Sequence, residues 1–140
     1  MNIREYTESD ELPVVSLWQE CGLVVPQNDP ARDIARKLLV GRDLFLVGVG
    51  DSGLVGTVMG GYDGHRGWIN YLAVKPSVRG SGYGRQLMRE VEELLRLRGC
   101  AKINLQVRAT NDGVIAFYKT LGYGNDNVVG LGKRLTYDND

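Results

Sequence analysis

Residues 74–85, Val-Lys-Pro-Ser-Val-Arg-Gly-Ser-Gly-Tyr-Gly-Arg, join a strand-like apolar run to an amphipathic helical pattern. Glycine fills three of the five positions 80–84, so the backbone there is able to approach a ligand closely. Amide N–H groups at the start of a helix lack partners, and the helix dipole adds positive potential. Such a turn favours an anion such as a diphosphate, with added charge from Arg79 and Arg85. A glycine-rich turn without a ligand remains the alternative at this point.

Two common nucleotide-binding motifs do not fit this turn. A dinucleotide-binding G-x-G-x-x-G beginning at Gly80 or Gly82 would need glycine where the chain has Arg85 or Leu87. The phosphate-loop pattern G-x-x-x-x-G-K-[ST] occurs nowhere in the sequence. The sequence therefore supports neither of these nucleotide sites.

Alternating helical and strand patterns precede the glycine-rich turn. They first predict a strand at residues 3–6 and a helix with Leu12, Val15, Trp18 and Cys21 on its apolar face. A second helix is capped by Asp29-Pro30, has Ile34, Leu38 and Leu39 on its apolar face and ends at Gly41. Strands follow at 44–49 and 54–59, joined by the turn Asp51-Ser52-Gly53, and at 68–74. The last strand is apolar on both faces, so we expect it to be central and covered on both sides.

Four further patterns follow the turn. The first is a helix with Leu87, Met88, Val91, Leu94 and Leu95 on its apolar face that ends at Gly99. The second is an alternating strand over Lys102–Arg108, with Asn104 and Gln106 facing a cleft. The third is a helix that is capped by Asn111 or Asp112 and carries Ile115, Phe117, Tyr118 and Leu121, and the last is a pair of short strands at about 123–125 and 128–135. This order predicts a mixed α/β (α+β) fold of three layers, with a sheet between helices.

Composition fits one globular domain spanning residues 1–140. The 17 basic and 17 acidic residues cancel, which gives no general basis for a nucleic-acid or membrane partner. We expect a cytoplasmic protein, because no apolar run is long enough for a membrane helix and the N-terminus lacks the pattern of a signal peptide. The two cysteines, Cys21 and Cys100, and the single His65 form no metal-binding pattern and no disulfide framework, so no metal is expected.

One motif and its flanks resemble a known family. The spacing Arg79-x-x-Gly82-x-Gly84 matches the R/Q-x-x-G-x-G/A acetyl-CoA motif of the GNAT (GCN5-related N-acetyltransferase) superfamily. Residues 71–74 are similar to the family strand that receives the pantetheine arm, and residues 111–123 to its second cofactor segment. Residues 56–67 resemble the small bacterial YpeA-like acetyltransferases. The resemblance implies the GNAT fold, with a central, mostly antiparallel sheet and flanking helices.

The resemblance also implies roles for individual residues. The cofactor-binding residues would be Leu72, Ala73, Val74, Arg79, Gly80, Ser81, Gly82, Tyr83, Gly84, Arg85, Asn111 and Tyr118. A neutral amine would attack the thioester of acetyl-CoA directly within a ternary complex, without an enzyme nucleophile. Tyr118 would protonate the leaving sulfur; the alternative is a tyrosine that only lines the core or cleft.

The general base is less well defined. Several lysine-modifying relatives have a glutamate where this chain has Trp68. Asp63 and His65 precede that strand and would accept a proton directly or through water. Turn formation by residues 63–67 is the alternative role of Asp63, and a chain of waters is the alternative base.

Other functions remain open at the level of sequence. The acceptor is an amine on a protein N-terminus, a lysine or a small molecule, and residues 22–33 and 125–129 are expected to shape its pocket. A non-catalytic acetyl-CoA sensor and a different acyl donor are the alternatives to acetyl transfer. The final strands would be free to pair with a second copy, which leaves a homodimer as a further alternative.

Overall fold

The computed structural model describes residues 1–139. In chain order its elements are β1 (Asn2–Glu5), a 3₁₀ turn (Glu8–Asp10), α1 (Glu11–Glu20), α2 (Pro30–Val40), β2 (Phe45–Gly50), β3 (Gly53–Tyr62), β4 (Gly67–Val74), a second 3₁₀ turn (Pro76–Val78), α3 (Tyr83–Leu97), β5 (Ile103–Leu105) and α4 (Asp112–Thr120). The five strands form one sheet in the order β1-β2-β3-β4-β5, antiparallel except for the parallel pair β4–β5. The predicted fold class is confirmed.

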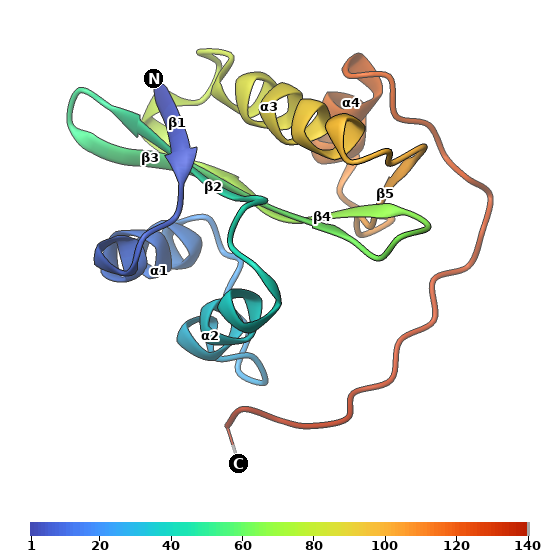
Figure 1. The fold of residues 1–140 in the computed structure, drawn as a ribbon, viewed down its shortest axis with the longest axis horizontal. Helices are drawn as coiled ribbons and strands as arrows, with labels where there is room; N and C mark the ends of the chain where they lie inside the picture. The colour runs from blue at the N-terminus through green and yellow to red at the C-terminus, as the bar shows by residue number, and fades with distance from the viewer. Residues whose placement is uncertain (140) are drawn as a thin grey trace.

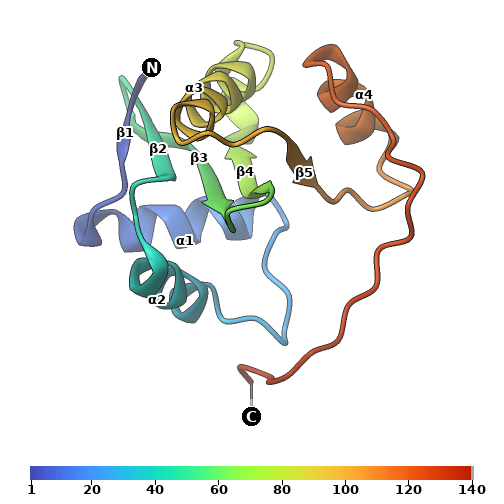
Figure 2. The ribbon, with the colours of Figure 1, turned by 45° about the vertical axis from the view of Figure 1, so that its right-hand side comes forward.

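The sheet separates two layers of helices, as Figures 1 and 2 show. Helices α1 and α2 cover one face, whereas α3 and α4 lie on the other. Side chains along a strand alternate between faces, so Phe45 and Val47 belong to the core beneath α1 while Leu44 and Leu46 belong to the core beneath α3. Burial on both faces explains why these strands read as nearly continuous apolar runs.

Two glycines in β3 allow α3 to lie close against the sheet. A Cβ atom at Gly56 would come within 2.8 Å of Leu87 Cδ1, and one at Gly60 within 2.6 Å of Val91 Cγ2. Real Cβ atoms do not approach other heavy atoms this closely. The glycines therefore fix how closely α3 approaches the sheet, and the glycine-rich turn leads into the N-terminus of this helix.

The predicted apolar faces of the first two helices are wrong at one position each. Leu12 is 80% exposed and Leu39 is 89% exposed, whereas Val14, Leu17 and Trp18 are the buried residues of α1. At about 100° per residue, Leu12 points roughly 160° away from Val14 around the helix, and Leu39 about 140° away from Ile34. Both leucines therefore point away from the sheet.

The sequence predicted a central strand at residues 68–74, and this prediction is wrong. Strand β3 is in the middle, and β4 is the fourth of five. Trp68 is 38% exposed and Asn70 is also exposed. Beyond Ile69, β4 has no partner on its β5 side within residues 1–139, because β5 pairs only with Gly67, Trp68 and Ile69.

The predicted pair of C-terminal strands is also wrong. Residues 124–138, called the C-terminal strap here, have no regular secondary structure and run from α4 along the outside of the molecule to α2 (Figure 1). Glycines at 124, 130 and 132 weaken strand formation, since glycine loses more conformational freedom than other residues. Asp138 holds the far end, because its carboxylate pairs with Arg36 and accepts a hydrogen bond from the amide of Asp29. None of the helices within residues 1–139 has the length and apolar character needed to span a bilayer.

Candidate active site

The glycine-rich turn has the geometry of an anion site. Helix α3 begins at Tyr83, with Gly82 as its N-cap at φ 83°, and Gly80 has φ 84°. Apart from the adjoining residues, no atom lies within 4 Å of the position that a Cβ would take at either glycine. Among the described residues, no acceptor receives the backbone N–H groups of residues 80–85. Six successive free donors at the start of a 15-residue helix fit a ligand with several anionic oxygens, such as a diphosphate.

Gly84 has a different environment from the other two glycines of the turn. A Cβ at Gly84 would lie 3.1 Å from Phe117 Cζ, so this glycine allows α4 to pack beside α3. Arg85 links the same two helices, because its Nη2 donates to Thr120 Oγ1 at 3.2 Å. In the structure, these two residues position α4 relative to the turn.

Arg79 is folded back onto the end of β4. Its Nε donates to the carbonyl oxygen of Val74 at 3.2 Å, and that oxygen also accepts the Cys21 thiol at 3.4 Å. The Val74 carbonyl is therefore already paired within the protein. Leu72 is half-buried and Ala73 is buried, and both lie in the part of β4 that has separated from β5.

A cavity of about 1230 Å³ lies between β5, α4 and the C-terminal strap. Its lining includes the residues that the sequence predicted to face a cleft, Asn104 and Gln106, and part of the predicted acceptor segment, Asn125, Asp126 and Val128. None of residues 22–33 or 79–85 lines it. The cavity is therefore separate from the turn but shares α4 with it.

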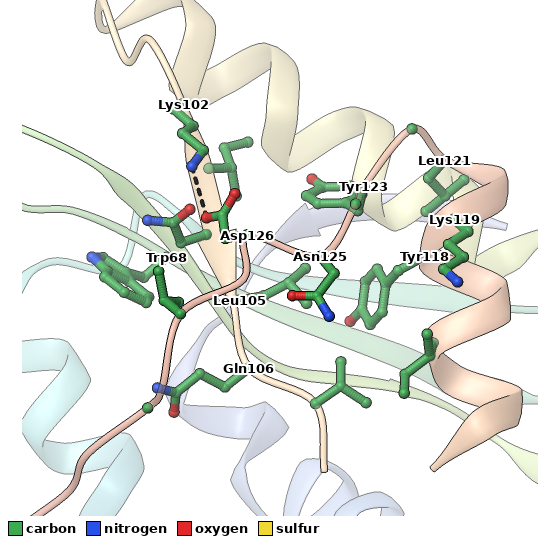
Figure 3. A pocket seen from close by; sticks show the side chains of 18 of the residues that line it. Trp68, Lys102, Leu105, Gln106, Tyr118, Lys119, Leu121, Tyr123, Asn125 and Asp126 are labelled. Carbon is green, nitrogen blue, oxygen red and sulfur yellow. Dashed lines mark hydrogen bonds and ion pairs between the residues drawn. The ribbon is translucent and has the colours of Figure 1, made fainter. Parts of the chain in front are cut away.

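Tyr118 connects the turn to this cavity. It lies on α4, is only 9% exposed, and packs in the same apolar cluster as Leu72 and Val74. Its ring points from α4 toward Asn125 (Figure 3). The Tyr118 hydroxyl forms no hydrogen bond with any residue that the structure describes. Burial raises the pKa of that hydroxyl to about 12. Tyr118 therefore keeps its proton at neutral pH and has a donor to offer to the cavity.

Two polar pairs on the cavity wall were not predicted. Lys102 Nζ pairs with Asp126 Oδ2 at 2.7 Å, as Figure 3 shows, and Tyr123 donates its hydroxyl proton to Glu92 Oε2 at 2.5 Å. Their partners are 24 and 31 residues apart, so no local pattern in the sequence indicates either pair.

The structure places the two remaining predicted site residues in local roles. Asp63 Oδ1 accepts the amides of His65 and Arg66 at 2.8 and 2.7 Å, while Oδ2 accepts Trp68 Nε1 at 3.2 Å. These hydrogen bonds lower the pKa of Asp63, led by the amide of Arg66. Asn111 is the N-cap of α4, and its Oδ1 accepts the amide of Val114 at 3.3 Å. Neither residue lines the cavity.

Cation-binding side chains are not gathered at the site. Throughout the described chain, no three or more His, Cys, Asp or Glu side chains are arranged to hold a metal ion. The free donors at residues 80–85 fit an anion and not a cation.

Comparisons with known proteins agree with this geometry. The acetyltransferase (GNAT) family matches residues 6–123. An acetyltransferase of Yersinia enterocolitica is 46% identical over 140 residues, covering all of this chain and 99% of the relative. A PaiA N-acetyltransferase from Thermoplasma acidophilum, solved with coenzyme A, has the same fold with a TM-score of 0.80 at 19% identity, over 92% of each chain. Ard1 from Thermoplasma volcanium is 28% identical, with a TM-score of 0.75 over 86% of this chain and 80% of its own. The chain therefore belongs to the GNAT family and is an acetyl-CoA-dependent N-acetyltransferase.

Proposed function

We propose that the protein moves an acetyl group from acetyl-CoA to an amine that enters the cavity beside β5. Acetyl-CoA supplies an activated thioester. The free amides of residues 80–85 bind the diphosphate, and the unpaired β5 side of β4 at Leu72 offers main-chain groups to the pantetheine arm. A main-chain N–H of β4 donates to the acyl oxygen as negative charge develops there.

Tyr118 carries the proposal, because its side chain is only 9% exposed and its hydroxyl faces the cavity without a protein partner (Figure 3). A donor held in a site of low dielectric stabilises a developing thiolate and gives it a proton. The raised pKa keeps this proton on the hydroxyl across the neutral range. The acceptor amine attacks directly, and no cysteine is needed to carry the acetyl group.

The base that deprotonates the amine is proposed to be water, with Asp63 as the residue to test. Asp63 has a lowered pKa and already accepts three N–H groups, which makes it a weak base. Asp63→Asn keeps an oxygen for both turn amides. If Asp63 is the base, this variant retains acetyl-CoA affinity and loses turnover or changes its pH profile; if water is the base, both remain as in the unmodified protein.

The test of the proposed function is Tyr118→Phe, which keeps the ring and removes the hydroxyl. With an acceptor identified by screening an amine panel for thiol release, we expect turnover to fall by roughly 10²- to 10⁴-fold. Acetyl-CoA affinity by calorimetry should remain within about twofold.

Tyr123→Phe is the matched control, because Tyr123 lines the same cavity but donates to Glu92. Its turnover should stay near that of the unmodified protein. An unaltered chemical step in a pre-steady-state measurement of Tyr118→Phe would show that Tyr118 is not the acid.

A further inference from the structure

Strand β4 contains a bulge just beyond the point where it separates from β5. Its pairing with β5 ends at Ile69. In its pairing with β3 the register shifts between Asn70 and Ala73, so that Tyr71 and Leu72 together face one residue of β3. The direction of the main-chain groups beyond this bulge is therefore set by the pairing of the residues that follow it.

The carbonyl of Val74 lies on the free side of β4. Lys75 donates its amide to the carbonyl oxygen of Val55 at 2.8 Å, which pairs Lys75 with β3. Neighbouring residues of an antiparallel pair alternate between hydrogen-bonded and non-hydrogen-bonded positions, so Val74 directs its main-chain groups away from β3. Within residues 1–139, β5 pairs with β4 only as far as Ile69. The Val74 carbonyl is therefore an acceptor on the edge that is proposed to receive the pantetheine arm.

The side chain of Arg79 covers this acceptor. Its Nε donates to the Val74 carbonyl at 3.2 Å, and its Nη2 donates to Cys21 Sγ at 3.5 Å. The Cys21 thiol in turn donates to the same carbonyl at 3.4 Å, so each of the three groups contacts the other two. Cys21 is the C-cap of α1, which places the guanidinium beside the negative end of that helix. These contacts hold Arg79 over the edge of β4.

A bound diphosphate would offer Arg79 stronger partners. The residue directly precedes the free amides of residues 80–85, and its side chain is exposed. A guanidinium pairs with phosphate oxygens bidentately and with charge on both sides, which the carbonyl of Val74 and the thiol of Cys21 do not offer. An anion in the glycine-rich turn therefore draws Arg79 away from β4 and uncovers the carbonyl.

We propose that Arg79 is a specificity-determining residue for the acyl donor: it covers the Val74 carbonyl until the diphosphate of the donor binds it, and this carbonyl then accepts an N–H of the pantetheine arm. This inference rests on the proposed function. A donor without a diphosphate has to compete with Arg79 for the carbonyl. If the carbonyl is uncovered in about a tenth of the molecules, such a donor binds about tenfold more weakly than it would to the uncovered form alone.

The experiment compares two donors that share the thioester and the pantetheine arm. S-acetylpantetheine lacks the diphosphate and the adenosine that acetyl-CoA carries. The variant Arg79→Ala uncovers the carbonyl and also removes a charge that the diphosphate would use. Calorimetry should therefore show changes of opposite sign: S-acetylpantetheine binds the variant about 3- to 10-fold more tightly than the unmodified protein, whereas acetyl-CoA binds it more weakly.

Two further variants separate the cover on the carbonyl from the loss of charge. Cys21→Ala removes both contacts of the thiol and keeps Arg79, so it should strengthen the binding of both donors, by up to about threefold. Arg85→Ala is the matched control, because it removes a guanidinium from the same turn, but Arg85 donates to Thr120 and not to β4. Its affinity for S-acetylpantetheine should stay within about twofold of that of the unmodified protein.

Other results would overturn the inference. If Arg79→Ala binds S-acetylpantetheine no more tightly than the unmodified protein does, or if neither binds it detectably, Arg79 acts only on the diphosphate. An equal gain in Arg85→Ala would show a general effect of charge. In all these cases the proposed function stands while acetyl-CoA binds. Failure of acetyl-CoA to bind the unmodified protein would instead contradict the proposed function, and this inference with it.

Discussion

Gly82 and Gly84 lie two residues apart in the same turn, yet the structure gives them different tasks. Gly82 has a positive φ and open space around it, whereas Gly84 has a neighbour 3.1 Å from the position of its missing Cβ. The motif R/Q-x-x-G-x-G/A already treats them differently, because it allows only glycine at the position of Gly82 but glycine or alanine at that of Gly84. The packing of Phe117, 33 residues further along the chain, gives the physical reason why Gly84 is small.

Gly82→Leu should abolish the thermal stabilisation given by acetyl-CoA. A ligand at ~100 times its dissociation constant stabilises a protein by about 2.7 kcal/mol, which a thermal scan detects. A leucine at Gly82 would project into the space where the diphosphate is proposed to bind and would resist φ 83°. If the variant and the unmodified protein show equal ligand-induced shifts of Tm, the turn is not the binding site.

Gly84→Ala should instead reduce stability without ligand. Its added methyl group presses on Phe117, and overpacking of this kind costs typically 1–3 kcal/mol. Urea denaturation measures the loss, and the shift of Tm by acetyl-CoA should persist. A ligand effect lost in Gly84→Ala at unchanged stability would assign Gly84 to the ligand and not to helix packing.

At the scale of elements, variants of Asn111 separate its role as the N-cap of α4 from the predicted contact with the cofactor. Asn111→Ala should lower the free energy of unfolding by about 1 kcal/mol, because the amide of Val114 loses its acceptor. Asn111→Ser restores an acceptor and should recover the stability in urea denaturation. Acetyl-CoA affinity that stays low in Asn111→Ser would support the predicted cofactor contact, whereas recovered affinity would limit Asn111 to its cap.

The elements that the sequence predicted well are those whose patterns are local. Helix α3 was predictable from a five-residue apolar stripe, and α4 from its Asn111 cap. The free donors of the turn were predictable for the same reason. By contrast, the bulge at Tyr71 depends on a hydroxyl of β3 and a ring of α1, and no window of neighbouring residues contains those contacts.

In the C-terminal strap, the sequence predicted strands that the structure does not contain. Val128, Val129, Leu131 and Leu135 look like strand residues, but they are 77–91% exposed. The position of the strap is set by long-range contacts, among them the ion pair of Asp138 with Arg36 across 102 residues. A β-rich composition cannot reveal such an anchor, so the strands were predicted where a strap exists.

At the scale of the whole molecule, the Asp138 anchor makes the stability depend on pH in the acid range. The Arg36 guanidinium and the Asp29 amide lower the pKa of Asp138 from 3.8 to about 2. A carboxylate with a lowered pKa in the folded state stabilises the protein fully above its unfolded pKa and loses that contribution as pH falls through the folded pKa. The contribution should therefore fade between about pH 4 and pH 2.

The difference in Tm between the unmodified protein and Asp138→Asn checks this window. We expect the variant to melt at lower temperature at pH 7 and the difference to disappear near pH 2. Asp51→Asn is the control, because Asp51 is an exposed aspartate in the turn between β2 and β3, and it should leave Tm nearly unchanged. A difference for Asp138→Asn that stays constant across this range would mean that the anchor does not depend on the charge of Asp138.

The exposed strap also contains a site at which the rate of cleavage by a protease measures how firmly the strap is bound to the rest of the molecule. Lys133 is exposed in a segment without backbone pairing in a sheet or helix, which is the kind of segment that trypsin cuts. The next residue, Arg134, donates hydrogen bonds to the carbonyl oxygen of Gln27 and to the side-chain oxygen of Asn28. Cleavage after Lys133 therefore requires these contacts to break, and the rate of cleavage measures how often this part of the strap leaves Gln27 and Asn28. A single cut would then leave the segment after Lys133 attached to the rest of the molecule only by its non-covalent contacts.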